Sequence, residues 1–175
     1  MRRIVWAARG VAAGALLISV LASRVAESQE SAKERTALVA ALRANHIALV
    51  NGVQAAASTG KPISAKYEYE DGKLQLSVYT EKAGQFFEVV VDHADGNVAK
   101  TEKITGGGDL AAARAQTTAM AKAASSLADA IEKALAANPG FSAVRATAAL
   151  KNGKPVADIT LNKGTEFKMV AEPLS

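Results

Sequence analysis

The stretch from Ile63 to Ile104 constrains the fold of this chain most strongly, because apolar and polar residues alternate along it. A period of two is the pattern of a strand with one face buried and the other in water. Asp71-Gly72 separates two such runs and is typical of a type I′ turn, in which both central residues need positive φ. The stretch therefore predicts antiparallel strands joined by tight turns, at residues 63–70, 73–81, 85–92 and 97–104.

An alanine-rich segment before this sheet, residues 31–58, has the spacing of a helix. Its apolar stripe consists of Leu38, Leu42, Leu49 and Val53. Thr59-Gly60-Lys61-Pro62 is expected to end the helix, with glycine at a left-handed cap and proline just beyond it. Gly52 is expected to weaken the helix by roughly 1 kcal/mol relative to alanine.

A second helix is expected after the sheet. Gly106-Gly107-Gly108 breaks all periodicity and is interpreted as a linker between two modules. Asp109 is the predicted N-cap of a helix that runs to about Ala137 and ends at Asn138-Pro139-Gly140. Its narrow, alanine-rich seam suits a helix laid across a sheet, and self-association through this seam is the alternative.

Residues 141–175 repeat the strands of the first module. Asn152-Gly153-Lys154 follows Asp71-Gly72-Lys73 by 81 residues, whereas the third strand matches at an offset of 80. The change in offset falls in a turn, where deleting one residue costs little stability. A deletion within a strand would instead move every later side chain to the other face of the sheet. The expected fold class is α+β, with two tandem modules at 29–105 and 109–175, linked by 106–108. Each module is expected to be one helix packed on a small antiparallel sheet of three to four strands.

Residues 1–28 have the layout of a secretory signal peptide. A basic segment with Arg2, Arg3 and Arg9 precedes an uncharged apolar run of 12 residues, 11–22. A membrane-spanning helix needs about 20 apolar residues, so a cleaved signal is predicted, with cleavage after residue 22 or 28. The protein is therefore expected to be exported and periplasmic or secreted. An uncleaved signal that anchors it to the inner membrane is the alternative.

The basic charge of the chain lies mostly in this N-terminal segment. Removing its four arginines and Glu27 from 21 basic and 17 acidic residues lowers the net charge from +4 to +1. No basic patch with interleaved aromatic residues then remains, so nucleic acid is not an expected partner. The chain has no cysteine, which excludes disulfides, thiolate zinc sites and a cysteine nucleophile.

The third strand and the turn after it are similar to a known family. In Phe87-Glu88-Val89-Val90-Val91-Asp92-His93-Ala94-Asp95-Gly96-Asn97-Val98, four residues match a strand that ends in Val-Asp-x-x-x-Gly-x-Val: Val91, Asp92, Gly96 and Val98. This segment resembles the PepSY domain, and the resemblance covers about residues 32–175. A second copy, opened by Asn138-Pro139-Gly140, stops before the glycine-containing turn. The resemblance implies two tandem copies of a non-enzymatic module outside the cytoplasm that restrains or regulates peptidases. It carries no catalytic residues.

The chain contains two histidines, His46 and His93. His46 continues the stripe of Leu42 and Leu49 and is interpreted as a partly buried structural residue, with pH sensing beside a carboxylate as the alternative. His93 lies in a turn with Asp92 and Asp95. This turn lacks the alternating oxygen ligands and the distal glutamate of a calcium loop. Its side chains are instead expected to bond local backbone groups.

Other features similar to known sites are also incomplete. Gly106-Gly107-Gly108-Asp109 lacks the Gly-Lys-Ser/Thr ending of a phosphate-binding loop, and Asp109 would repel an anion. The sequence contains no Gly-x-Ser-x-Gly elbow and no two histidines at metal-ligand spacing. Four carboxylates of the first hairpin are expected to lie in solvent: Glu68, Glu70, Asp71 and Glu81. No catalytic residue, metal site or cofactor is therefore predicted.

Two classes of function follow from these observations. The first is an exported PepSY-like binding module that regulates or inhibits a secreted or periplasmic peptidase, or another envelope protein. Its surface would be a sheet edge or an exposed strand face. Tyr79 is the candidate partner-binding residue, and covering a neighbouring strand is its alternative role. The second is a structural or small-ligand-binding periplasmic protein, with the ligand in the cleft between the modules. No enzyme is predicted, and membrane contact is expected only through an uncleaved signal.

Overall fold

The computed structural model describes residues 33, 35–45, 47–70 and 72–175. The chain divides into two compact units, Met1–Arg35 and Thr36–Ser175, and the following description concerns the second. The predicted signal peptide at 1–28, His46 and Asp71 lie outside the described residues. No helix in the described part of the chain is long and apolar enough to cross a membrane.

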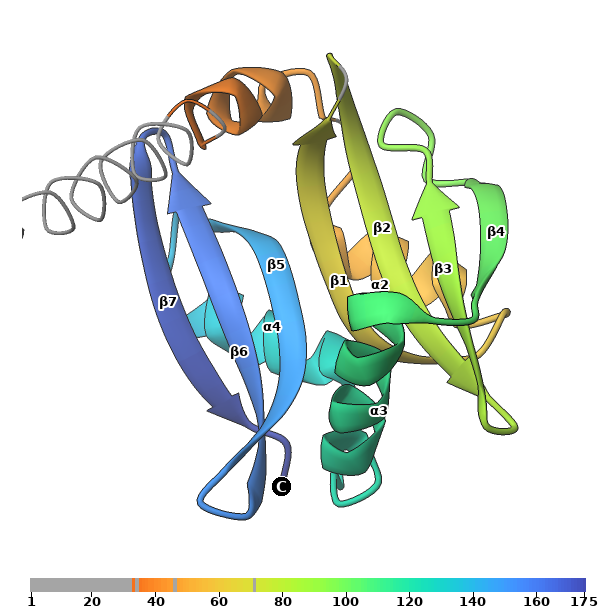
Figure 1. Ribbon diagram of the computed structural model, residues 1–175. Helices are drawn as coiled ribbons and strands as arrows, with labels where there is room; N and C mark the ends of the chain where they lie inside the picture. The colour runs from red at the N-terminus through yellow and green to blue at the C-terminus, as the bar shows by residue number, and fades with distance from the viewer. Residues whose placement is uncertain (1–32, 34, 46, 71) are drawn as a thin grey trace, which may run out of the picture. The chain divides into compact units, whose positions relative to one another are not determined.

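The second unit is built on one antiparallel sheet with the strand order β4-β3-β2-β1-β5-β6-β7 (Figure 1). The strands are β1 (Lys61–Glu70), β2 (Lys73–Lys82), β3 (Gln85–Val91), β4 (Val98–Ile104), β5 (Ser142–Lys151), β6 (Lys154–Lys163) and β7 (Glu166–Pro173). The predicted α+β class is confirmed, but the prediction of two tandem modules with separate small sheets is wrong, because β1 pairs with β5. Each half leaves its first strand with an open edge, and the two edges satisfy each other's backbone groups.

The junction between the two halves of the sheet is short. The hairpins β1–β2 and β5–β6 each pair over nine positions, whereas β1 and β5 pair over three. The paired residues are Ser64 with Thr147, Ala65 with Ala146, and Lys66 with Arg145. On either side of this junction the two strands diverge (Figure 1). The halves are therefore joined at the centre of β1 and β5 and separated at their ends.

The two halves are structural repeats with a constant offset of 81 residues. The pairing of β1 with β2 is irregular at Ile63, and that of β5 with β6 is irregular at Val144. Two-residue turns follow β2 and β6 alike, since Lys82 pairs with Gln85 and Lys163 with Glu166. The predicted one-residue deletion in this turn is therefore wrong. Sequence similarity had matched Phe87 with Phe167, but the register makes Phe86 the equivalent of Phe167.

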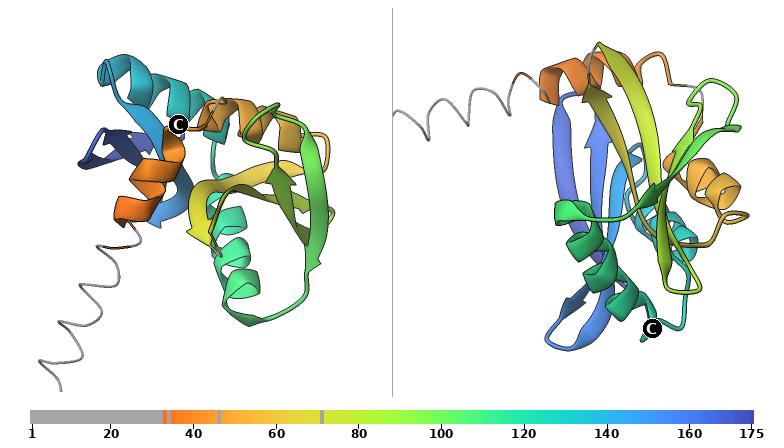
Figure 2. Two further views of the ribbon diagram at one scale, coloured as in Figure 1. Left: turned by 90° about the horizontal axis from the view of Figure 1, so that it is seen from above. Right: turned by 45° about the vertical axis from the view of Figure 1, so that its right-hand side comes forward.

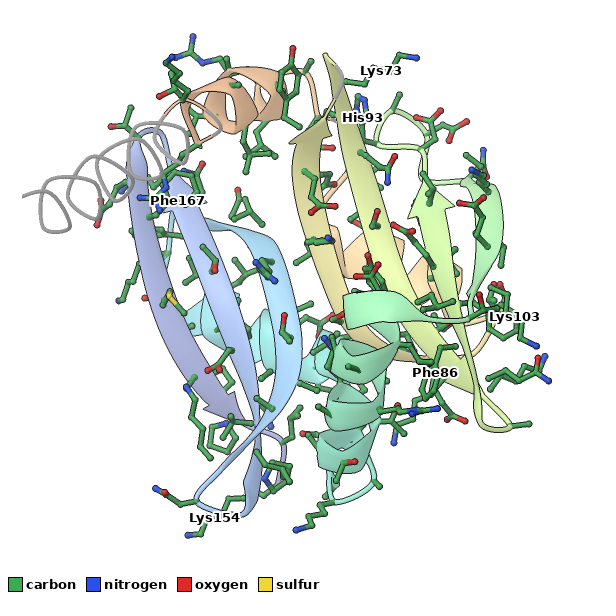
Figure 3. The ribbon with its side chains drawn as sticks, viewed as in Figure 1. Lys73, Phe86, His93, Lys103, Lys154 and Phe167 are labelled. Atoms are coloured by element: carbon green, nitrogen blue, oxygen red, sulfur yellow. The ribbon has the colours of Figure 1, made fainter. Side chains whose placement is uncertain are left out.

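The repeats are related by an approximate two-fold axis through the Ala65–Ala146 pair, since these residues are themselves 81 positions apart. Figure 3 shows the result: Lys73 and Lys154 lie at opposite ends of the sheet, and so do Phe86 and Phe167. The arrangement resembles an isologous dimer interface contained within one chain.

Helices lie on both faces of the sheet (Figures 1 and 2). The helices α2 (Leu49–Ala56) and α4 (Leu127–Ala137) contact one face. The helix α3 (Gly107–Met120) contacts the opposite face across the junction. It is held there by Ser64 Oγ, which donates to Gln116 Oε1 at 3.0 Å, and by Lys61 Nζ, which donates to the carbonyl of Met120 at 2.9 Å.

Each long helix predicted from the sequence is two helices in the structure. Residues 36–42 are helical, and the chain then turns before α2 begins. Asn45 accounts for this break, because its Nδ2 donates to the carbonyl of Ile47 at 2.6 Å. Ser126 starts α4 by a reciprocal cap: its Oγ accepts from the Asp129 N–H at 3.1 Å, and Asp129 Oδ2 accepts from its N–H at 2.9 Å.

The start of α3 also differs from the prediction. Gly106 is the N-cap, and Asp109 lies in the first turn of the helix. The triglycine interpreted as a linker is thus the cap and first residues of α3. A negative charge in the first turn still favours the helix, since it faces the positive end of the helix dipole.

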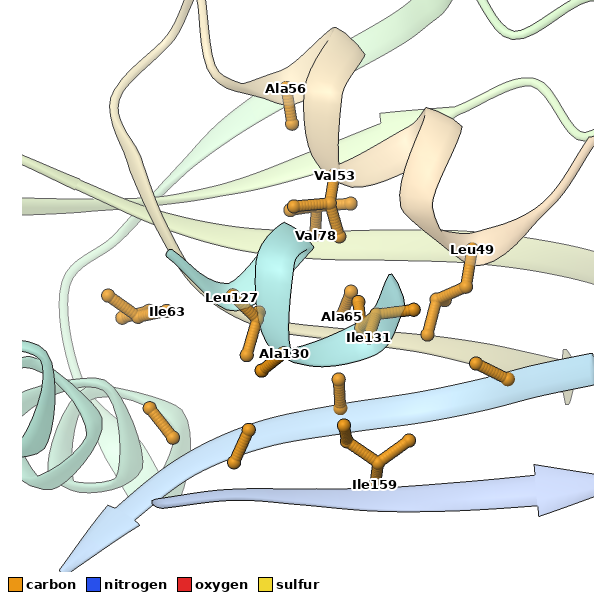
Figure 4. Packing of buried hydrophobic residues seen from close by; sticks show 14 of the residues in the cluster. Leu49, Val53, Ala56, Ile63, Ala65, Val78, Leu127, Ala130, Ile131 and Ile159 are labelled. Atoms are coloured by element: carbon orange, nitrogen blue, oxygen red, sulfur yellow. The ribbon is translucent and has the colours of Figure 1, made fainter. Parts of the chain in front are cut away.

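The core lies between the sheet and the α2–α4 layer. Figure 4 shows Val53 of α2 close to Val78 of β2, and Ile131 of α4 close to Ala65 at the junction. Gly52, expected only to weaken α2, is buried against β2. A Cβ atom at this position would lie 2.3 Å from Cδ2 of Leu76. Glycine therefore permits the close approach of α2 to the sheet.

Candidate functional site

A cleft of about 400 Å³ opens on the side of the junction where β1 and β5 diverge beyond Lys66 and Arg145. Both halves of the repeat line it. The first half contributes Tyr67 of β1 and residues of the segment 39–49. The second half contributes Leu135 of α4, residues 141–144 at the start of β5, and Asn162 with Gly164 after β6. The cleft thus exists because the two sheets meet only at their centre.

One wall of the cleft is apolar. Leu42, Leu135 and Phe141 are partly buried hydrophobic residues that pack against the core, and Val144 is 4% exposed. The Phe141 ring has Lys163 Nζ 5.7 Å from its centroid, within the range of a cation–π contact. Apolar side chains that remain partly exposed in a concave surface are the usual lining of a small-molecule site.

Three polar side chains of the cleft are engaged in hydrogen bonds within the protein: Tyr67, Asn45 and Asn162. The Tyr67 hydroxyl is a donor with two acceptors in range, the carbonyl of Ile47 at 2.9 Å and Oδ1 of Asn45 at 3.1 Å. Burial raises the pKa of Tyr67 to about 12, although the bond with Asn45 acts in the opposite direction. Asn162 Nδ2 donates to the carbonyls of Gly164 at 2.9 Å and Glu166 at 3.1 Å. These groups shape the cleft and have little capacity left for a ligand.

Two polar groups are exceptions: the exposed Ser142 hydroxyl, which has no hydrogen bond among the described residues, and Arg43. Arg43 is exposed, and it is the only ionised side chain among the described residues that line the cleft. Within the described part of the chain, its guanidinium makes no ion pair or side-chain hydrogen bond. A guanidinium has five N–H donors and no acceptor, so this group is available to an anion.

Tyr79, the candidate partner-binding residue, lies at a different place. It is on β2, an interior strand, and faces α3 next to a smaller pocket of about 80 Å³ that Lys66, Asp109 and Gln116 also line. Lys66 Nζ lies 5.5 Å from the ring centroid and 2.5 Å from Oε1 of Glu68. Burial raises the pKa of Tyr79. The ring packs against the core, and a role in partner binding stays a prediction.

His93 lies in the turn between β3 and β4 (Figure 3), where its Nδ1 is buried without a hydrogen-bond partner among the described residues. The expected bonding of this turn is confirmed. Asp92 Oδ1 accepts from the Ala94 N–H at 2.7 Å, and Asp95 Oδ1 accepts from the Asn97 N–H at 2.9 Å. The bond from Asn97 also lowers the pKa of Asp95. No group of three or more potential ligands for a metal occurs in the described ranges.

The four carboxylates expected to lie in solvent have local roles or are not described. Glu68 is paired with Lys66, as above, and Glu81 Oε1 accepts from the Gly84 N–H at 2.7 Å in the turn after β2. Asp71 and the side chain of Glu70 lie outside the described part. None of these carboxylates lines the cleft. The sequence pointed to Tyr79 in the first hairpin, whereas the cleft of about 400 Å³ lies at the junction.

The free edges of the sheet are β4 and β7. Nearly every residue of β4 is exposed, and Lys100 pairs with Glu102 on it at 2.8 Å. Charges of this kind discourage the addition of another strand. On β7, Met169 is 74% exposed. The binding of a partner at a sheet edge stays a prediction.

No family model matches the chain. No curated protein matches it either. Among solved structures, the chain is similar to a candidate lipoprotein from Clostridium difficile 630, with 15% sequence identity and a TM-score of 0.38, over 68% of this chain and 78% of that one. A likeness this distant carries no argument about fold or function. Membership of the PepSY family therefore stays a prediction.

Proposed function

We propose that the protein is an exported binding module without catalytic activity, and that the cleft between its two halves holds a small ligand. The observation that supports this proposal is the cleft itself. Its volume of about 400 Å³ falls within the roughly 300–1,000 Å³ of typical ligand sites. Its walls come from both repeats. Tyr67, Asn45 and Asn162 are already hydrogen-bonded within the protein, so they hold the cleft in shape before a ligand arrives.

Binding of the neutral fluorescent dye Nile red tests this proposal. We expect saturable, one-to-one binding to the purified protein. The substitution Leu42→Trp, which adds a bulky ring to the cleft wall, should weaken this binding by about tenfold or more, since it displaces the dye from apolar surface. Leu150→Trp is the matched control, because Leu150 is 37% exposed and does not line the cleft. Equal binding by both variants would place the dye elsewhere and refute the proposal.

The second candidate function is PepSY-like regulation of an exported peptidase. It is favoured by the segment that carries the resemblance. Val91 ends β3 and Val98 begins β4. Between them, the Gly96 N–H donates to the carbonyl of Asp92 at 2.8 Å, and Gly96 has φ of 79°. The glycine of the motif is thus required by a turn that needs positive φ.

Inhibition assays separate this candidate from the first. The protein would slow the cleavage of a reporter peptide by an envelope protease, in proportion to its concentration. Met169→Lys, at the exposed site on β7, should weaken inhibition if a sheet edge makes the contact, and Tyr79→Phe should weaken it if the predicted residue does. If the wild type leaves proteolysis unchanged while Nile red binds the cleft, the regulatory function is rejected and the first proposal stands.

A further inference from the structure

The ligand of the cleft can be narrowed to a chemical class, an inference that rests on the function proposed above. The cleft offers two kinds of free surface. Carbon surface comes from Leu42, Leu135, Phe141 and Val144. The free charged group is the Arg43 guanidinium, which has no ion pair within the part of the chain that the structure describes. A ligand that matches both surfaces has an apolar body and one anionic end.

Polar alternatives fit poorly, because the neutral polar side chains of the described lining are engaged, except for the Ser142 hydroxyl. Asn45 and Tyr67 bond each other and the backbone of Ile47, and the Asn162 amide group donates to two carbonyls. A sugar or a polar peptide would bury hydroxyl or amide groups without partners here, and such burial is costly. An apolar chain loses no hydrogen bonds on entering.

The charged residues of the described lining also determine whether the ligand is an anion or a cation. No aspartate or glutamate is among these residues, so a cation would have no counter-charge. Lys163, beside the Phe141 ring, adds a second positive charge near the apolar wall. Arginine binds carboxylates through two parallel hydrogen bonds, and one guanidinium matches one carboxylate. We propose that the cleft binds an apolar monocarboxylate. Arg43 would contact the carboxylate, and the apolar wall that includes Leu42 and Phe141 would contact the hydrocarbon chain.

Competition against Nile red tests this proposal, with decanoate and its neutral analogue decanol as the probes at about pH 8, where the carboxylate is ionised. Arg43→Gln should weaken decanoate binding by about tenfold, as expected for loss of a charge-assisted contact, and leave decanol within about twofold. Because Arg43 is exposed, the variant should fold normally, which circular dichroism checks. Arg114→Gln is the matched control, since Arg114 is an exposed arginine of α3 away from the cleft. It should bind both probes as the wild type does.

The outcomes test separately whether the ligand is a monocarboxylate and whether the cleft is a binding site. A selective loss of decanoate in Arg43→Gln, together with loss of both probes in Leu42→Trp, supports the proposal. If Arg43→Gln binds decanoate as tightly as the wild type, or if decanoate does not displace the dye, the monocarboxylate is rejected and the cleft remains a binding site. If Nile red itself does not bind, the proposed function fails, and the ligand class fails with it.

Discussion

Replacing Gly52 by alanine tests how closely α2 is seated on the sheet. In an open helix this change would stabilise the protein by roughly 1 kcal/mol, since alanine is the better helix former. Here the new Cβ would lie 2.3 Å from Cδ2 and 3.1 Å from Cγ of Leu76. Leu76 is fully buried, so the side chain cannot move away without displacing other core residues. Overpacking of this kind costs about 1–3 kcal/mol.

The expected net result is destabilisation by up to about 2 kcal/mol, after the helix-propensity gain of roughly 1 kcal/mol is subtracted. Urea unfolding followed by circular dichroism measures it. Leu76→Ala alone should cost about 2–5 kcal/mol, but the double variant should be more stable than the sum of both changes by about 1 kcal/mol, because the cavity accepts the new Cβ. Gly108→Ala in α3 is the control, since a Cβ there would meet nothing within 4 Å. If Gly52→Ala stabilised the protein by roughly 1 kcal/mol, as in an open helix, the close approach of α2 to β2 would be refuted.

Two further predictions concern single residues. The folded state raises the pKa of Tyr67 from 10.0 to about 12, so it holds the phenol neutral, and the free energy of unfolding should fall by on the order of 2 kcal/mol as the pH rises from 10 to 12. Tyr67→Phe should remove this part of the pH dependence, measured by urea titrations at several pH values. If the unfolding free energy of the variant fell with pH as steeply as that of the wild type, the burial of the hydroxyl would be contradicted. Ser126→Ala should destabilise the protein by about 1 kcal/mol through loss of the α4 cap. Ala137→Gly, at the other end of α4, is the control and should leave the Ser126–Asp129 cap intact. Hydrogen bonds to Ser126 lower the pKa of Asp129, so NMR titration of Asp129 reports whether the cap is present.

Local features of the fold could be predicted from the sequence. The alternation and turn residues of 63–104 placed four strands close to their observed bounds, because strand faces and tight turns depend on neighbouring residues. The break before α4 was not predicted, although Ser126 and Asp129 have the spacing of a capping box. The analogous break before α2 depends on a bond from Asn45 to Ile47, which amino-acid periodicity does not reveal.

Features that depend on distant residues could not be predicted. The pattern of β1 shows which face is buried but not which strand lies beside it, so the pairing with β5 was missed. The offset in the third strand was wrong because two phenylalanines were matched by type and not by register. Gly52 could be judged only with Leu76 beside it. Strand pairing and close packing depend on residues that are far apart in the sequence, and local patterns do not show which of these residues meet.

The residues that line the cleft were missed for the same reason. Arg43, Tyr67, Leu135 and Val144 come from four separate elements and meet only because β1 and β5 diverge. A cleft between two modules was predicted, but with no residue attached to it. Tyr79 was singled out because its neighbours point to the opposite face, yet the sequence could not show that α3 covers that face of the junction.

The most direct test of the account is to map the binding of decanoate by NMR amide shifts in the isotope-labelled protein. The shifts should cluster on Arg43, Tyr67, Leu135 and Val144, with little change on β4 or β7. Shifts confined to the edge strands, or no shifts at concentrations that displace Nile red, would contradict a ligand site between the two halves.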